Sequence, residues 1–210
     1  MTPEELQIAI ARGYEERGIE FKGSRPRTDR LFFARVARAV LGMSNRRDGG
    51  RIVVGVDEVD GQLVPTGLSA QDLSTWKYDD VAAGLSEYAD PNVTLDLDRV
   101  SLDGKDYVIL RVQEFDESPT LCSKDFQQRL AGRNEVILRR GACYVRSRSK
   151  AETSEIPSQD EMRELLDLAI DKGVRRFLTR AHDVGLSTQP TGAPSPSDAE
   201  RFEQQLGGLA

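Results

Sequence analysis

Apolar and polar positions recur at spacings that predict alternating helices and strands over the first sixty residues. Residues 3–12 carry apolar side chains at helical spacing, and Ile19–Lys22 alternates as a short strand. Residues 29–43 predict an amphipathic helix, with Arg27, Arg30, Arg35 and Arg38 opposite its apolar stripe. Residues 51–57 are apolar on both faces, which is typical of a central strand, and Gly55 within them indicates a bulge or a close backbone approach.

The later pattern predicts three hairpins and further helices. Asp60-Gly61 and Asp103-Gly104 are typical of hairpin turns. Ser158 and Glu161 have the spacing of a capping box at the start of the last helix. The remaining expected segments are one or two helices in 69–88, strands at 93–100 and 107–115, a short extended segment at 119–123, a polar connector at 126–134, and a final hairpin formed by 136–139 and 142–146.

Composition predicts one domain followed by a tail. The chain has 210 residues, and residues 187–197 are mostly Pro, Thr, Gly and Ser. We therefore expect a domain at 1–183 and a flexible linker at 184–210. There is no basic leader followed by an apolar stretch and no apolar run long enough for a membrane helix, so the chain is expected to be cytoplasmic, without a membrane partner.

Few residues favour thiol or histidine chemistry. Cys122 and Cys143 are far apart and fit no metal spacing, so we interpret them as reduced thiols. The single histidine, His182, argues against a His-rich zinc site and against a Ser-His-Asp triad, and is best interpreted as a surface residue. There is no Gly-rich loop ending in Gly-Lys-Ser/Thr, so the sequence supports no ATP site.

Basic residues are concentrated in two segments of a chain whose net charge is −6. Residues 22–51 hold nine basic and two acidic side chains, and residues 129–150 hold seven basic and one acidic. Arginine predominates in both, which favours bidentate phosphate contacts; scattered solubilising charges are the alternative. The candidate nucleic-acid-binding residues are Arg25, Arg27, Arg30, Arg38, Arg46, Arg47, Arg139, Arg146 and Arg148.

The strand at Ile19–Lys22 places a carboxylate and an ammonium on one face. Side chains alternate along a strand, so Glu20 and Lys22 point to one side and Phe21 points to the other. With one more carboxylate just upstream, this face can hold a divalent metal against a phosphate. An edge strand with a solvated ion pair would give the same tripeptide.

Three motifs resemble those of the Schlafen-type Alba-like domain family, over about residues 13–168. Glu15 is followed by Ile19-Glu20-Phe21-Lys22, similar to the family's opening Glu-x3-hydrophobic-Glu-Phe-Lys. Ser-Asn at 44–45 leads to Gly-Gly-Arg-Ile-Val-Val-Gly-Val-Asp at 49–57, and Gly-Ala-Cys-Tyr-Val-Arg-Ser-Arg-Ser at 141–149 matches a third motif. Arg148 stands where many members have glycine.

The resemblance implies an α+β fold with a mixed sheet and flanking helices. It also implies a catalytic triad of Glu15, Glu20 and Asp57 with Lys22 beside it, the three acids holding Mg²⁺ or Mn²⁺. By spacing, the first and third acids could instead be Glu16 and Glu58.

Two functions follow from the sequence as alternatives. One is a metal-dependent endoribonuclease acting on tRNA or other structured RNA. The other is a non-catalytic DNA- or RNA-binding module of a transcriptional regulator or a phage-defence protein. We expect a homodimer, because a single domain of this kind is half of the two-module horseshoe of vertebrate relatives. A further domain after residue 210 is compatible with either function.

Overall fold

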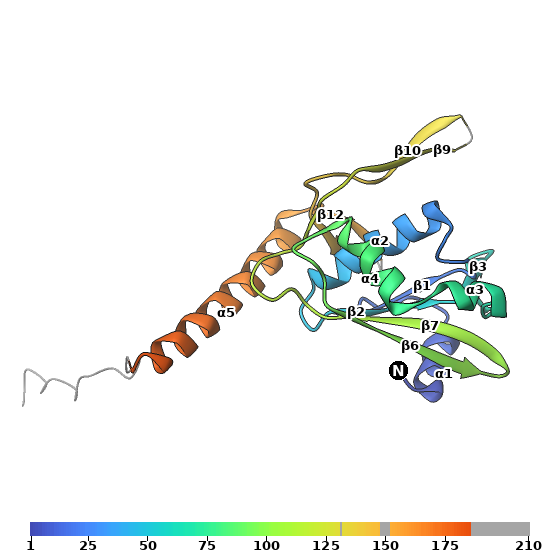
Figure 1. The fold of residues 1–210 in the computed structure, drawn as a ribbon, viewed down its shortest axis with the longest axis horizontal. Coiled ribbons are helices and arrows are strands. Elements are labelled where there is room, and N and C mark those ends of the chain that lie inside the picture. Colours follow the sequence, from blue (N-terminus) through green and yellow to red (C-terminus); the bar gives the residue numbers. More distant parts are fainter. Residues whose placement is uncertain (131, 148–151, 186–210) are drawn as a thin grey trace, which may run out of the picture. The chain divides into compact units, whose positions relative to one another are not determined.

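A four-stranded mixed sheet lies at the centre of the computed structural model, which describes residues 1–130, 132–147 and 152–185. β1 runs parallel to β2, β2 is antiparallel to β7, and β7 is antiparallel to β6 (Figure 1). The strands, in the order in which they lie across the sheet, are β1 (Ile19–Lys22), β2 (Gly50–Val54), β7 (Lys105–Val112) and β6 (Leu95–Leu102). The α+β fold class expected from the sequence is therefore confirmed.

Helices cover both faces of this sheet, which is why β2 is apolar on both sides. Ile52 and Val54 join the core cluster of α2 (Arg30–Ser44), whereas Val53 joins that of α1 (Pro3–Ala11). All three valine and isoleucine side chains are fully buried. Burial of each such side chain stabilises the fold by about 1.5–3 kcal/mol, so the two helices hold β1 and β2 firmly in place.

Gly55 divides the apolar run that the sequence pattern predicted as one strand. Its φ of +116° ends β2 at Val54. The chain then forms β3 (Val56–Val59), which pairs with β4 (Gln62–Pro65) through the predicted Asp60-Gly61 turn. A side chain at residue 55 would also meet the ring of Tyr107 at 2.9 Å. The predicted close approach at Gly55 is confirmed, and the single strand over 51–57 was wrong.

The elements after β4 complete the two sides of the core. Trp76 and Leu85 are buried in the cluster around α2. Helical structure predicted in 69–88 is confirmed as two helices, and the hairpin at Asp103-Gly104 joins β6 to β7. The remaining elements here are α3 (Ala70–Thr75), α4 (Tyr78–Ser86), β5 (Ala89–Asp90) and β8 (Leu121–Cys122).

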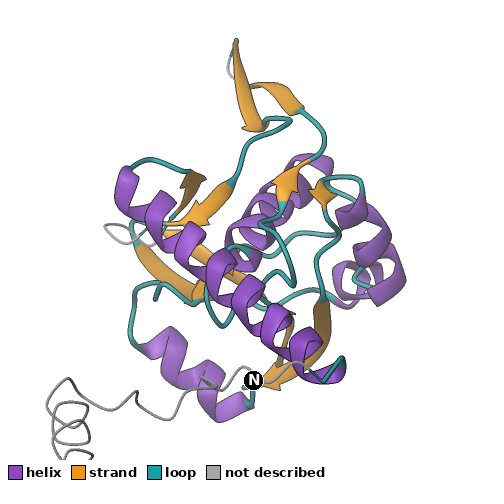
Figure 2. Ribbon diagram, turned by 90° about the vertical axis from the view of Figure 1, so that its left-hand side faces the viewer, coloured by secondary structure: helices purple, strands orange, loops and turns teal. Residues whose placement is uncertain are grey.

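A two-stranded ribbon replaces the polar connector expected at 126–134. β9 (Phe126–Leu130) pairs with β10 (Arg133–Leu138), and the ribbon extends away from the sheet (Figure 2). The predicted pairing of 136–139 with 142–146 was also wrong. β11 (Tyr144–Arg146) pairs with β12 (Thr153–Glu155) instead, because β10 is already paired with β9.

The last helix, α5 (Gln159–Asp183), begins at the predicted cap, where Glu161 N donates to Ser158 Oγ at 3.4 Å. The chain divides into two compact units at Gly173. Of the second unit, residues 173–185 are described, and most of the linker expected at 184–210 lies outside the described residues. Cys122 and Cys143 are free thiols, as predicted. No helix among the described residues has the length and apolar character needed to span a membrane.

Candidate functional site

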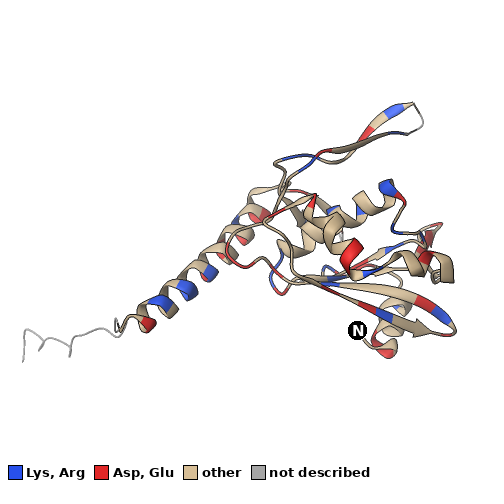
Figure 3. Cartoon of the chain, in the orientation of Figure 1, with Lys and Arg blue, Asp and Glu red and all other residues tan. Residues whose placement is uncertain are grey.

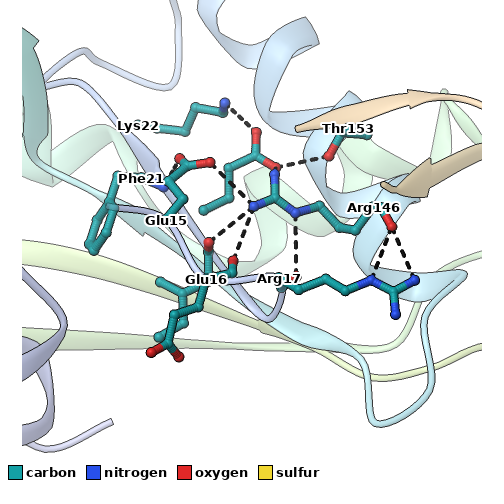
Figure 4. Close-up of polar contacts among 9 residues, drawn as sticks. Glu15, Glu16, Arg17, Phe21, Lys22, Arg146 and Thr153 are labelled. Atoms are coloured by element: carbon teal, nitrogen blue, oxygen red, sulfur yellow. Dashed lines mark hydrogen bonds and ion pairs between the residues drawn. The ribbon is translucent and has the colours of Figure 1, made fainter. Parts of the chain in front are cut away.

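β1 places Glu20 and Lys22 on one side of the sheet edge, as the alternation predicted. Glu20 is buried, with 6% of its surface exposed, and Lys22 Nζ donates to Glu20 Oε1 (Figure 4). Phe21 is buried on the opposite face among the residues of the α1 cluster. A carboxylate this deeply buried needs positive partners, because desolvation of an isolated charge is costly.

Arg146 supplies the second positive charge from β11. Its side chain is fully buried, and Nη1 donates to Glu20 Oε2 at 2.7 Å while Nη2 donates to Glu15 Oε2 at 3.2 Å. The guanidinium also donates to backbone carbonyls at Arg17 (3.3 Å), Glu16 (3.2 Å) and Ile19 (3.2 Å). Arg146 therefore ties β11 to the segment that leads into β1. In this position it is closed to a phosphate in solution, so its role differs from the nucleic-acid contact that the sequence suggested.

Thr153 and Gly42 complete the surroundings of Glu20. Thr153 Oγ1, on β12, donates to Glu20 Oε2 at 2.9 Å. A Cβ at residue 42 would lie 2.5 Å from Thr153 Cγ2, so α2 approaches β12 this closely only because glycine occupies the position. This close packing fixes the Thr153 hydroxyl, which supplies a further hydrogen bond to the buried Glu20 carboxylate.

Glu15, and not Glu16, belongs to this cluster. The backbone N–H of Phe21 donates to Glu15 Oε1 at 2.7 Å, whereas Glu16 forms an ion pair with Arg12. Burial raises the pKa of Glu15, and the neighbouring charge of Glu20 raises it further. The structure thus settles which of the two adjacent glutamates faces Glu20.

The third predicted acid, Asp57, has a different partner. Asp57 Oδ1 accepts a hydrogen bond from Ser24 N at 3.2 Å. A Cβ at residue 23 would lie only 2.5 Å from this oxygen, so glycine at that position makes the contact possible. The next residue on β3, Glu58, is exposed and lines the same cleft as Glu15 and Glu20. Since neighbouring side chains on a strand point to opposite sides, the side of β3 that faces the cleft carries Glu58.

The cleft beside Glu20 has a volume of about 450 Å³ and mixes both signs of charge. Ion pairs account for part of this charge, as Arg35 pairs with Glu135 at 3.3 Å. The charged lining residues are Glu15, Glu20, Glu58, Glu135 and Glu152 on the acidic side and Lys22, Arg35, Arg38 and Arg146 on the basic side.

These residues do not present a ready metal site in the part of the chain that the structure describes. Both oxygens of Glu15 and both oxygens of Glu20 already accept hydrogen bonds from protein groups. Within the described ranges no group of three or more His, Cys, Asp or Glu side chains is placed to hold an ion. Hard cations such as Mg²⁺ need several oxygen ligands, so the carboxylates would have to exchange their present partners to bind one.

Most of the predicted phosphate-binding arginines have partners within the protein. Arg47 pairs with Asp171 at 2.6 Å, and Arg139 pairs with Glu155. Arg27 donates to the carbonyl of Asp80 and lies 4.6 Å from the Phe33 ring centroid. The guanidinium of Arg38 lies 5.4 Å from the ring centroid of Tyr144, Arg46 Nη1 donates to the carbonyl of Gly49, and Arg148 lies outside the described residues.

Four exposed arginines on the β9–β10 ribbon and at or just before the start of α2 lack such partners. Arg30 is the first residue of α2 and Arg25 lies in the loop before it, whereas Arg129 and Arg133 lie on the ribbon. None of these four side chains has an ion-pair or hydrogen-bond partner among the described residues. Figure 3 shows basic positions on both α2 and the β9–β10 ribbon. Sequence reasoning noted the charge of the second basic segment but did not single out Arg129 and Arg133; the Gly132 turn between polar flanks was the available signal.

The comparisons with known proteins identify the family. The family model described as Schlafen, AlbA_2 matches residues 15–153, about two thirds of the chain. No curated protein matches. Two similar solved structures are the N-terminal domain of a RecG-related protein from Nitrosomonas europaea (22% identity, 55% of this chain and 75% of that one, TM-score 0.43) and the DIP2311 protein from Corynebacterium diphtheriae (17% identity, 63% and 28%, TM-score 0.39). The matched range contains Glu15, Glu20, Asp57 and Arg146. The chain belongs to the Schlafen AlbA_2 family.

Proposed function

We propose that this domain binds nucleic acid through a surface formed by the start of α2 and the β9–β10 ribbon. The observation that carries the proposal is the set of four exposed arginines, Arg25, Arg30, Arg129 and Arg133, that lack protein partners in the described structure. Membership of the Schlafen AlbA_2 family supports a role connected with nucleic acid.

The two parts of this surface are held together by protein contacts. Arg30 and Leu31 of α2 line a pocket with Phe126 and Gln127 of β9. Further along α2, Arg35 pairs with Glu135 of β10 at 3.3 Å. A polynucleotide that contacts α2 is therefore within reach of the ribbon. Arginine suits this role because its planar guanidinium donates two parallel hydrogen bonds to phosphate oxygens.

Structured RNA such as tRNA is the proposed ligand, with duplex DNA as the competitor in the test. Phosphate contacts read backbone shape and carry little base information, so binding should depend weakly on sequence and strongly on salt. If the domain only binds, it would serve as the nucleic-acid-binding module of a transcriptional regulator or a phage-defence protein.

Paired and unpaired arginines provide a matched test of this surface. Arg30→Ala with Arg133→Ala removes two unpartnered guanidinium groups, while Arg47→Ala with Arg139→Ala removes two that already have acidic partners. Total tRNA and plasmid DNA are titrated with each protein in a gel-shift assay. We expect at least about tenfold weaker binding for the first pair and a smaller loss for the second. Equal losses for both pairs would reject the assigned surface.

Cleavage of the bound RNA is a second candidate function. It is favoured by one observation: Glu135 and Ile137, on the ribbon strand β10, line the same cleft as Glu15, Glu20 and Lys22. A strand lying on the ribbon would therefore pass close to these carboxylates. A divalent ion would activate water for phosphodiester hydrolysis, and Mg²⁺ or Mn²⁺ is the ion proposed.

The cleavage candidate is tested with tRNA in the presence of Mn²⁺ and in the presence of EDTA. Glu58→Gln and Lys22→Gln are the informative variants, because neither residue is fully buried and both line the cleft. Loss of cleavage with retained gel shifts would support the nuclease. A wild-type protein that shifts tRNA and leaves it intact with Mn²⁺ would leave binding as the function.

The homodimer stays a proposal of the same kind. Two copies would place two basic faces on one RNA helix, doubling the number of phosphate contacts. Light scattering of the protein with a short RNA duplex should give two protein chains per duplex. A complex with one chain per duplex would contradict the dimer.

A further inference from the structure

A second cavity, of about 460 Å³, is lined by residues 16–19, whereas Glu15 and Glu20 line the cleft described above. It is formed where β1 and β2 begin, by the turn at 16–18 and the turn at 48–50, together with Arg111 of β7. The two cavities have no lining residue in common. The volume falls within the range of about 300–1,000 Å³ that is usual for ligand sites.

Four arginines, Arg17, Arg46, Arg51 and Arg111, line this cavity, and two of them are neutralised by the protein. Arg17 donates to both oxygens of Glu164, at 2.8 and 2.6 Å. Arg111 lies 3.3 Å from Asp96 and 3.6 Å from Asp98. Their charges are therefore compensated without a ligand.

Arg51 is not compensated in this way. It lies directly opposite Arg111 in the antiparallel register of β2 and β7. Like charges directly opposite each other on neighbouring strands are destabilising. The side chain of Arg51 has no hydrogen-bond or ion-pair partner within residues 1–130, 132–147 and 152–185. Arg51 therefore lies at the wall of the cavity without an acidic partner of its own among the described residues.

Arg46 adds a second guanidinium without an ion-pair partner in the described part of the chain. Its Nη1 donates to the carbonyl of Gly49, while its Nε is buried without a hydrogen-bond partner in the described structure. Burial lowers the pKa of Arg46, and the neighbouring charge of Arg17 lowers it further. Of the two acids that line the cavity, Glu16 is paired with Arg12, and Asp48 is exposed. Four arginines and two acids therefore line the cavity itself.

We propose that this cavity binds a phosphate group, with Arg46 and Arg51 as its principal ligands. A phosphate has several strong acceptor oxygens and can take hydrogen bonds from guanidinium groups on different sides. It would accept hydrogen bonds from the guanidinium groups of Arg46 and Arg51 that line the cavity. The group is either a phosphate of the bound polynucleotide or a free phosphate compound, and the inference does not require the surface on α2 and the ribbon.

Thermal unfolding of the full chain with inorganic phosphate tests the site, with chloride at the same ionic strength as reference. Phosphate should raise the unfolding temperature of the wild-type protein and of Arg47→Gln, whose side chain pairs with Asp171. Arg46→Gln and Arg51→Gln should each weaken phosphate binding about tenfold or more. Without phosphate, Arg51→Gln should be about as stable as wild type, because the Arg51 side chain has no hydrogen-bond or ion-pair partner to lose among the described residues.

Oligonucleotides then distinguish the source of the phosphate. If a 5′-phosphate strengthens binding of a short RNA and Arg51→Gln cancels the gain, the cavity takes a terminal phosphate. If Arg51→Gln weakens 5′-phosphorylated and 5′-hydroxyl RNA equally, it takes a backbone phosphate. If only inorganic phosphate is affected, the ligand is a free compound. Stabilisation of wild type, Arg46→Gln and Arg51→Gln to the same extent by phosphate would overturn the site, whether or not RNA binds to the ribbon.

Discussion

Replacing Arg146 by methionine would remove the guanidinium that holds β11 against the segment preceding β1. Methionine keeps much of the side-chain volume in a site that is closed to solvent. The variant loses the charge-assisted hydrogen bonds to Glu20 and Glu15 and the three to backbone carbonyls. Removing one partner of a buried ion pair costs about 3–5 kcal/mol, mostly because the remaining charge is left without a partner.

Urea unfolding measured by circular dichroism tests this magnitude. With a denaturant dependence of roughly 2 kcal/mol per molar urea, the midpoint of Arg146→Met should fall by about 1.5–2.5 M. Arg47→Met, which breaks an exposed pair with Asp171, should change stability by less than about 1 kcal/mol. Adding Glu20→Gln to Arg146→Met should recover part of the loss. A loss below about 1 kcal/mol for Arg146→Met would refute the proposed structural role of the guanidinium.

Three further predictions concern titration, thiol reactivity and packing. Burial and Glu20 raise the pKa of Glu15, so wild-type stability contains a contribution that decreases as pH rises from 4.5 through the raised pKa. Urea unfolding measured at several pH values should show that the free energy of unfolding of Glu15→Gln rises relative to that of wild type over this pH window. A difference between the two proteins that does not change with pH would contradict this. Burial raises the pKa of Cys143 to about 11 and also raises that of Cys122, so a disulfide reagent at pH 8 should label both thiols much faster after denaturation than in the native protein. Labelling of the native protein within seconds would contradict the raised pKa values. Gly42→Ala should lower the free energy of unfolding by about 1–3 kcal/mol, because its Cβ has no room. Gly173→Ala, where a Cβ would meet nothing within 4 Å, should leave stability unchanged or raise it. Equal urea midpoints for the two variants would refute the packing argument.

Local patterns predicted the elements that bury a continuous apolar face. The helix at Arg30–Ser44 and the strand at Ile19–Lys22 follow from apolar spacing alone. Polar elements were harder to predict, because the β9–β10 ribbon has exposed residues on both faces and so lacks an apolar alternation. The incorrect hairpin over 136–146 has the same cause. The sequence pattern paired 136–139 with 142–146, but in the structure β10 pairs with the polar strand β9, and β11 pairs with β12.

Two of the three acids expected from the sequence, Glu15 and Glu20, lie together in the structure, in surroundings that the sequence did not indicate. The approach of Glu15 to Glu20 follows the family spacing, and the structure places both beside Arg146. Sequence reasoning assumed that basic side chains face solvent, so it assigned Arg146 to a ligand and not to the interior. Glu58, and not the predicted Asp57, lines the cleft. The chain breaks at Gly55, where β2 ends, and β3 then pairs separately with β4. Long-range pairing of charges carries no signature along the chain.

The salt dependence of RNA binding tests the central claim most directly. Replacing Arg25, Arg30, Arg129 and Arg133 together by alanine should remove up to four phosphate contacts. Each contact contributes about 0.7 to the slope of log K against log salt for a single strand and about 0.9 for a duplex, so the slope should become shallower by about 3. The matched variant that replaces the paired Arg47 and Arg139 should retain most of the wild-type slope. An unchanged slope in the fourfold variant, with its fold intact, would contradict binding through α2 and the ribbon.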